Sequence, residues 1–154
     1  MTTESKIEWT EMTWNPTVGC TKISPGCKNC YAEKMAERLK AMKTPGYENG
    51  FELTLIASRL QDPLTRKKPT VYFVNSMSDL FHEDVPFEFI DRVFDTIRQA
   101  SWHTFQILTK RADRMAFYFK GRKAPANAWL GVSVEDKKYG LPRIDHLRTV
   151  AATV

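Results

Sequence analysis

The sequence contains few cysteines, and its hydrophobic runs are short. Its 154 residues include three cysteines and three histidines. The apolar runs at 71–74 and 129–134 are far shorter than the roughly 20 residues that cross a bilayer, so we expect no membrane partner. The first six residues lack the apolar core of a secretory signal peptide, which predicts a cytoplasmic protein. In that reducing compartment, an odd number of thiols argues against disulfides and favours metal binding or redox chemistry.

Long blocks of one charge are also absent. The formal net charge is +5, and the basic residues form short clusters such as those at 66–68 and 122–123. This balance is compatible with a nucleic-acid or nucleotide partner. Solvated loops and helix ends explain such clusters at least as well, so charge alone does not identify the partner.

From residue 71 onward, strand-like and helix-like segments alternate. We expect strands at 71–74, 104–108 and 129–134, the first of them buried on both faces. The intervening helices should begin near Pro86, near Ala112 and near Leu141. Strands that alternate with helices predict βαβ units and a parallel sheet.

The first half is less regular. It contains a first strand near 14–18, a helix over 31–43 and a short strand at 52–56. The length suits one domain. The last four residues provide no helix cap, polar tail or closing element, and an open sheet edge is a liability. We therefore expect a single, incomplete α/β domain over 1–154 that is truncated at its C-terminus.

The cysteines form one motif, C-x6-C-x2-C, made by Cys20, Cys27 and Cys30. They lie in a loop rich in Pro, Gly, Ser and Asn, which allows thiolates to converge on one metal centre. The helix expected from Tyr31 would direct its free N–H groups and positive dipole end towards that centre. The motif therefore predicts a single metal site.

Three thiolates leave a four-ligand site one ligand short. In a [4Fe–4S] cluster, the remaining iron would be free to bind an external molecule. In a zinc site, a histidine would complete the set, and His82 is the candidate because it follows the strand at 71–74. We favour the cluster and keep zinc as the alternative.

The arrangement of a three-cysteine loop, a helix and repeated βα units resembles the radical S-adenosylmethionine (SAM) superfamily. The chain resembles more closely the three-Cys-motif family of phage and mobile-element proteins called phage gene product 37/68. The matching segments lie at 7–10, 13–16, 19–22, 24–33, 74–81, 108–111 and 129–135.

The resemblance implies a partial (β/α) barrel with parallel strands that carries a [4Fe–4S] cluster and SAM. The implied reaction is cleavage of SAM to a 5′-deoxyadenosyl radical, which acts on an unknown, nucleic-acid-related substrate. An external electron donor and a partner protein would assist. Two departures stand out: radical SAM enzymes usually have a three-residue first spacer instead of six, and members of the phage family continue past this C-terminus.

Polar residues follow each of the three expected strands of the second half. In parallel α/β sheets, ligands bind beyond the carboxyl ends of the strands. The resemblance implies that Ser76, Ser78 and Asp79 hold the amino group of SAM, since an acid and hydroxyls suit an ammonium group.

Two further strand ends complete the predicted ligand rim. Lys110 or Arg111 would hold the SAM carboxylate, and Glu135 would accept hydrogen bonds from the ribose hydroxyls. Each residue also has a structural interpretation: Asp79 as a turn residue, Lys110 and Arg111 as the start of a solvated helix, and Glu135 as a helix cap. The sequence identifies no catalytic acid or base.

Two other functions remain open at this stage. The chain could be a non-catalytic zinc-binding module for protein or nucleic-acid interaction, or a decayed fragment with neither metal nor activity.

Overall fold

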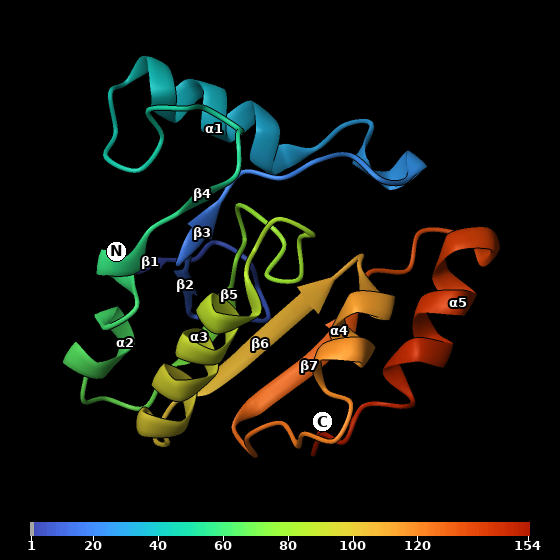
Figure 1. Cartoon of the computed structure of the whole chain (residues 1–154). Coiled ribbons are helices and arrows are strands. Elements are labelled where there is room, and N and C mark those ends of the chain that lie inside the picture. Colours follow the sequence, from blue (N-terminus) through green and yellow to red (C-terminus); the bar gives the residue numbers. More distant parts are fainter. Residues whose placement is uncertain (1) are drawn as a thin grey trace.

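The computed structural model describes residues 2–154 and has a five-stranded sheet at its centre (Figure 1). The spatial order is β1-β2-β5-β6-β7. Strand β1 is antiparallel to β2, and all other neighbours in this sheet are parallel. The strands are β1 (Thr2–Glu4), β2 (Met12–Trp14), β5 (Val71–Val74), β6 (Thr104–Thr109) and β7 (Ala128–Val132). The predicted α/β class is confirmed as a mostly parallel sheet, whereas the partial barrel stays a prediction.

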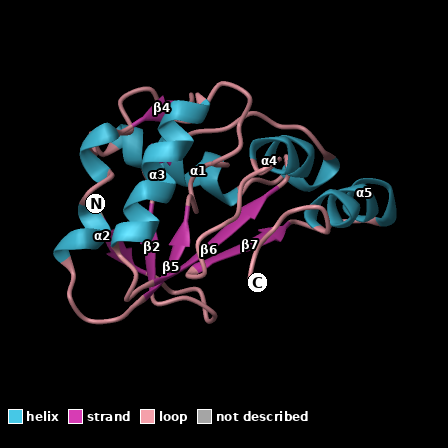
Figure 2. Ribbon diagram, turned by 60° about the horizontal axis from the view of Figure 1, so that its bottom comes forward, coloured by secondary structure: helices cyan, strands magenta, loops and turns pink. Residues whose placement is uncertain are grey.

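Most helices lie on one side of this sheet (Figure 2). The α-helices are α1 (Tyr31–Ala41), α2 (Asp62–Thr65), α3 (Phe87–Gln99), α4 (Ala112–Tyr118) and α5 (Lys137–Leu147). Two short 3₁₀ turns, η1 (Pro25–Cys27) and η2 (Ala57–Arg59), lie in the connections. No helix within residues 2–154 is long and apolar enough to cross a membrane.

Helix α3 supplies the main covering of the sheet. Its apolar stripe, which includes Ile90, Val93 and Ile97, is fully buried against strand residues such as Tyr72 and Phe105. Each such side chain contributes about 1.5–3 kcal/mol when it leaves water. The helical spacing in the sequence therefore placed α3 correctly, because only one of its faces is apolar.

The other face of the sheet is more open. Tyr72 and Val74 are buried, but Val71 and Phe73 are only partly buried, so the prediction of a strand buried on both faces was wrong. Trp129 on β7 pairs with Gln106 and lies on the same open face of the sheet, where it is 41% exposed. The apolar run at 71–74 thus forms a strand with one covered face and one partly open face.

The expected first strand at 14–18 is divided in two. Strand β2 ends at Trp14, and β3 (Thr17–Val18) pairs antiparallel with β4 (Thr54–Leu55) in a separate sheet. Pro16 lies between them; it has no N–H to donate, while its carbonyl accepts a hydrogen bond from Ile56 N at 2.8 Å. This break turns the chain towards the cysteine loop.

Helix α5 begins four residues earlier than expected. The Asp136 carboxylate caps it by accepting a hydrogen bond from Tyr139 N at 2.8 Å, and Pro142 lies inside the helix. After α5, the chain returns beside β7, where Leu130 N donates to Val154 O at 2.9 Å.

Candidate functional site

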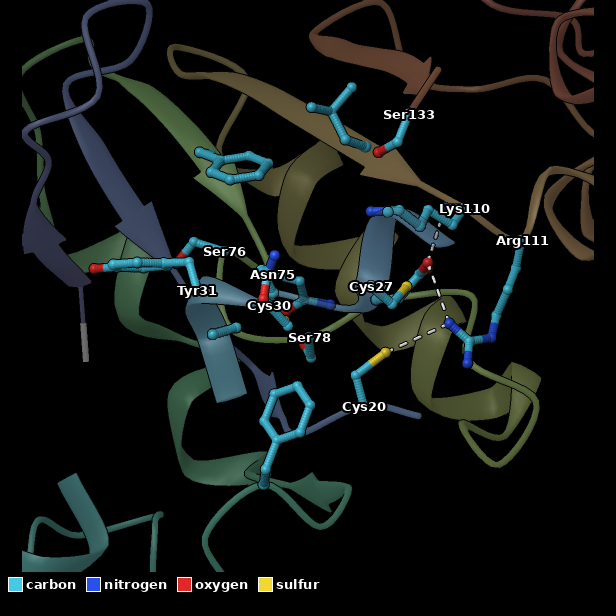
Figure 3. A pocket seen from close by; sticks show the side chains of 17 residues that line it. Cys20, Cys27, Cys30, Tyr31, Asn75, Ser76, Ser78, Lys110, Arg111 and Ser133 are labelled. Carbon is cyan, nitrogen blue, oxygen red and sulfur yellow. Dashed lines mark hydrogen bonds and ion pairs between the residues drawn. The ribbon is translucent and has the colours of Figure 1, made fainter. Parts of the chain in front are cut away.

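The three cysteines line one cavity of about 280 Å³ (Figure 3). Cys20, Cys27 and Cys30 are all partly buried. The cavity lies at the carboxyl ends of β5, β6 and β7, as expected for a ligand site in a parallel sheet. Its polar walls also include Asn29, Asn75, Ser76, Ser78, Asp79, Lys110, Arg111 and Ser133.

The loop is fastened to the sheet at its first cysteine. Gly19 has φ +82° and donates from its N–H to Met77 O at 3.0 Å. A side chain there would collide with the Glu52 backbone, so both the conformation and the close approach require glycine. Cys20 N then donates to Phe51 O at 3.1 Å. The start of the loop is therefore fixed before the spacer begins.

Arg111 joins this loop to the end of β6. It is only 6% exposed, and its Nη1 donates to Cys20 Sγ at 3.4 Å. Its Nη2 donates to Thr21 Oγ1 at 2.8 Å, and its Nε donates to Glu83 at 2.6 Å. All three guanidinium nitrogens are therefore engaged within the protein. The predicted contact of Arg111 with a SAM carboxylate stays a prediction.

The electrostatic surroundings of the thiols differ. Burial raises the pKa of the Cys20 thiol, and the Arg111 guanidinium opposes this shift only in part. At Cys27, burial also acts upwards, but hydrogen bonds from the backbone at Ile23 and Ser24 outweigh it and lower the pKa. Cys27 is therefore the more readily ionised of the two.

Asp79 connects two of the strand ends that line the cavity. Its Oδ1 accepts hydrogen bonds from Phe81 N at 3.0 Å and Thr109 Oγ1 at 2.7 Å, and its Oδ2 accepts one from Lys110 N at 2.9 Å. The carboxylate thus ties the end of β5 to the end of β6. This is the turn-forming role that the sequence left open, and the ammonium role stays a prediction.

Ser76 and Ser78 both line the cavity and are both hydrogen-bonded. Ser76 Oγ donates to Asn15 Oδ1 at 3.2 Å, and Ser78 Oγ donates to Thr17 O at 2.9 Å. Since a hydroxyl oxygen can accept while it donates, both remain able to meet an ammonium group.

Asn75 is a site residue that the sequence analysis did not select. It is 3% exposed, has φ +59°, and lines the cavity. Its Nδ2 is buried without a hydrogen-bond partner among the described residues. Lys110 extends into the same space (Figure 3). A buried free donor near a cation suits an anionic ligand group such as a carboxylate. The only sequence signal was its position directly after a strand.

Glu135 lies beside the cavity. A side chain at Gly26 would collide with its carboxylate, so the cysteine loop packs directly on it. Both carboxylate oxygens are buried without a hydrogen-bond partner among the described residues, and Arg143 Nη1 lies 3.6 Å from Oε1. The predicted ribose contact of Glu135 stays a prediction.

His82, the candidate fourth zinc ligand, is fully buried and already engaged. Its Nδ1 accepts from Asp84 N at 3.1 Å, so the proton of the neutral ring lies on Nε2, 2.9 Å from Thr21 Oγ1. Burial lowers its pKa, with Arg111 adding to that effect, which favours the neutral ring. Neither nitrogen is free to bind a metal.

Within residues 2–154, no three Cys, His, Asp or Glu side chains are grouped closely enough to hold a single metal ion. The three cysteines instead line one cavity.

The chain belongs to the family described as Protein of unknown function (DUF5131), whose family model matches residues 4–154. A comparison with curated protein sequences finds no match.

Two solved structures of spore photoproduct lyase are similar to this chain. One, complexed with dinucleoside spore photoproduct, has a TM-score of 0.66 at 12% identity and covers 99% of this chain. The other, a mutant with bound AdoMet and dinucleoside spore photoproduct, has a TM-score of 0.63 at 12% identity and covers 94%. The chain spans 46% and 44% of their lengths, respectively. At this identity, the likeness establishes the fold.

Proposed function

We propose that this protein is an iron–sulfur enzyme of the radical SAM type that acts on a nucleic-acid-related substrate in a phage or mobile element. The observation that carries the proposal is the position of the three cysteines. They line one cavity at the carboxyl edge of a sheet whose fold is similar to that of a lyase solved with AdoMet. Ligand sites of such sheets lie at this edge.

In this proposal, Cys20, Cys27 and Cys30 hold a [4Fe–4S] cluster and leave one iron for SAM. When bound, the pair would supply one-electron cleavage of SAM to methionine and a 5′-deoxyadenosyl radical, for which an external donor would provide the electron. The donor set suits it, because thiolates are the standard ligands of such clusters.

In this proposal, residues of the chain bind and orient SAM. The Lys110 ammonium and the free Asn75 Nδ2 bind the carboxylate of SAM, since both are donors that line the cavity. Ser76, Ser78 and Asp79 accept from its amino group. Glu135 accepts from the ribose, which would satisfy its buried oxygens.

The nature of the substrate is supported by two observations. The net charge of +5 suits an anionic partner, and the similar lyase structures contain a dinucleoside. The alternative of a zinc module is weakened by His82, whose two ring nitrogens are both engaged.

Anaerobic reconstitution with iron and sulfide tests the proposal. The full chain should become brown, with absorption near about 400 nm, and should then cleave SAM when reduced. A Cys27→Ala variant should lose the cluster and the cleavage, while Ser101→Ala, an exposed residue outside the cavity, should keep both. Stoichiometric zinc without any bound iron would overturn the proposal.

A further inference from the structure

A second, larger cavity adjoins the cysteine cavity. It has a volume of about 860 Å³, within the range of about 300–1,000 Å³ typical of small-molecule sites. Tyr31 and Ser76 line both cavities, so the larger cavity lies next to the cavity that the cysteines line. In Figure 3, the Tyr31 ring extends away from the cysteines, on the Ser76 side of the site.

One wall of this cavity is apolar and belongs to α1. Tyr31, Met35 and Leu39 follow each other at four-residue spacing and therefore share one face of the helix. Tyr31 is 66% exposed, and Met35 and Leu39 are only partly buried. The stripe is thus not used up by the core and leaves a flat ring and a thioether open to a ligand.

The lining also contains polar, uncharged side chains. These are Thr3, Ser5, Thr13, Asn15, Thr44 and Ser76. Such hydroxyl and amide groups can donate and accept hydrogen bonds along the edge of a ligand.

The charged side chains that line the cavity do not favour a charged ligand. Arg59, 9% exposed, is already engaged: it donates to Asn15 O at 3.2 Å and to Pro45 O at 2.8 Å. Glu4 and Lys6 are exposed and of opposite sign. The cavity is therefore suited to an uncharged ligand with one flat apolar face and a polar edge.

We infer that this cavity holds a nucleobase of the substrate, stacked on Tyr31 and Met35, with its polar edge towards Thr13 and Asn15. A nucleobase is planar and uncharged, and bases bind proteins by stacking on aromatic rings and by hydrogen bonds to their edges. This inference rests on the proposed function and specifies the substrate class and its position beside the cysteines.

The test uses the full chain, both without and with reconstituted iron and sulfide. Thymidine, adenosine and thymidylyl-thymidine are titrated in turn by calorimetry, with decanoate as an aliphatic probe that has no ring. A nucleoside should bind. Tyr31→Ala should weaken it about tenfold or more, as expected from the loss of one stacking partner, and Tyr31→Phe should retain it.

Met35→Glu provides a second variant, because Met35 lines the larger cavity and not the cysteine cavity. It should abolish nucleoside binding without changing iron content. Phe117→Ala, a 67% exposed aromatic residue on α4, is the matched control and should bind as the parent does. Circular dichroism identifies any variant that fails to fold, and the other then decides.

The outcomes separate this inference from the proposed function. Nucleoside binding by a chain that takes up no iron would overturn the enzyme and support the cavity. Three outcomes in a chain with an intact cluster and SAM cleavage would overturn the inference. They are the absence of nucleoside binding, nucleoside binding that is unaltered in both variants, and binding of decanoate alone.

Discussion

Arg111 determines how the first cysteine is held. One buried guanidinium contacts Cys20, Thr21 and Glu83, which belong to two segments far apart in the sequence. The first spacer has six residues, so it cannot fix Cys20 by its own shortness. The contact with Arg111 offers another means, because it positions Cys20 from the end of β6.

Replacement of Arg111 by glutamine should therefore affect the cysteine loop. We expect a loss of roughly 2 kcal/mol in the free energy of unfolding, since charged hydrogen bonds are removed from a buried site. Iron content after reconstitution should also fall, with partial recovery in Arg111→Lys. Urea denaturation and iron analysis measure the two effects. Arg38→Gln, an exposed residue of α1, is the control; an Arg111→Gln chain with full iron content would contradict this role.

Glu83 makes the same contact dependent on pH. Partial burial opposes the shift, but the hydrogen bond from Arg111 prevails and lowers the pKa of Glu83 to about 2. A carboxylate whose pKa is lowered by folding stabilises the folded chain at pH values above its ordinary pKa of about 4.3. That contribution is lost as the pH falls from there towards about 2.

Glu83→Gln should thus be less stable than the parent at pH 7, by about 1 kcal/mol or less because the carboxylate is 56% exposed. The difference should shrink below about pH 4. Thermal unfolding at pH 7, 5 and 3 measures it, with the exposed Glu8→Gln as control. A stability difference that stays constant over this range would refute the argument.

At the scale of elements, α5 depends on a capping residue. Asp136 accepts a hydrogen bond from Tyr139 N, which satisfies one of the free N–H groups of the first turn. The helix also contains Pro142, whose ring removes one internal hydrogen bond. The cap is therefore important to a helix that its own sequence weakens.

Asp136→Ala should cost about 1 kcal/mol in unfolding free energy. Equilibrium denaturation measures the change. Asp145→Ala, at an exposed position later in the same helix, should cost less, because it removes only a surface ion pair. Equal effects of the two substitutions would show that the cap is not what stabilises α5.

At the scale of the whole molecule, the two cavities are adjacent and share Tyr31 and Ser76 in their walls. The cysteine loop closes one side of the pair, α1 closes another, and the ends of β5 and β6 form its floor. In the proposed function this arrangement places the cofactors and the substrate base side by side, while each contacts different residues.

The sequence by itself determined the elements whose signal is local. Helix α3 and strands β5, β6 and β7 lie within a few residues of their predicted positions, because periodicity reflects which side of each element is buried. The clustering of Cys20, Cys27 and Cys30 in one loop is likewise a property of the sequence.

Only the tertiary structure decided how the polar groups are used. It directed Arg111 to Cys20, engaged both nitrogens of His82, and left Asn75 with a free buried donor. The contacts of His82 with Thr21 and of Arg111 with Cys20 join residues 61 and 91 positions apart, respectively. Whether two such residues form a hydrogen bond depends on a donor–acceptor distance that must be right to within a few tenths of an ångström. Local sequence patterns do not contain that information.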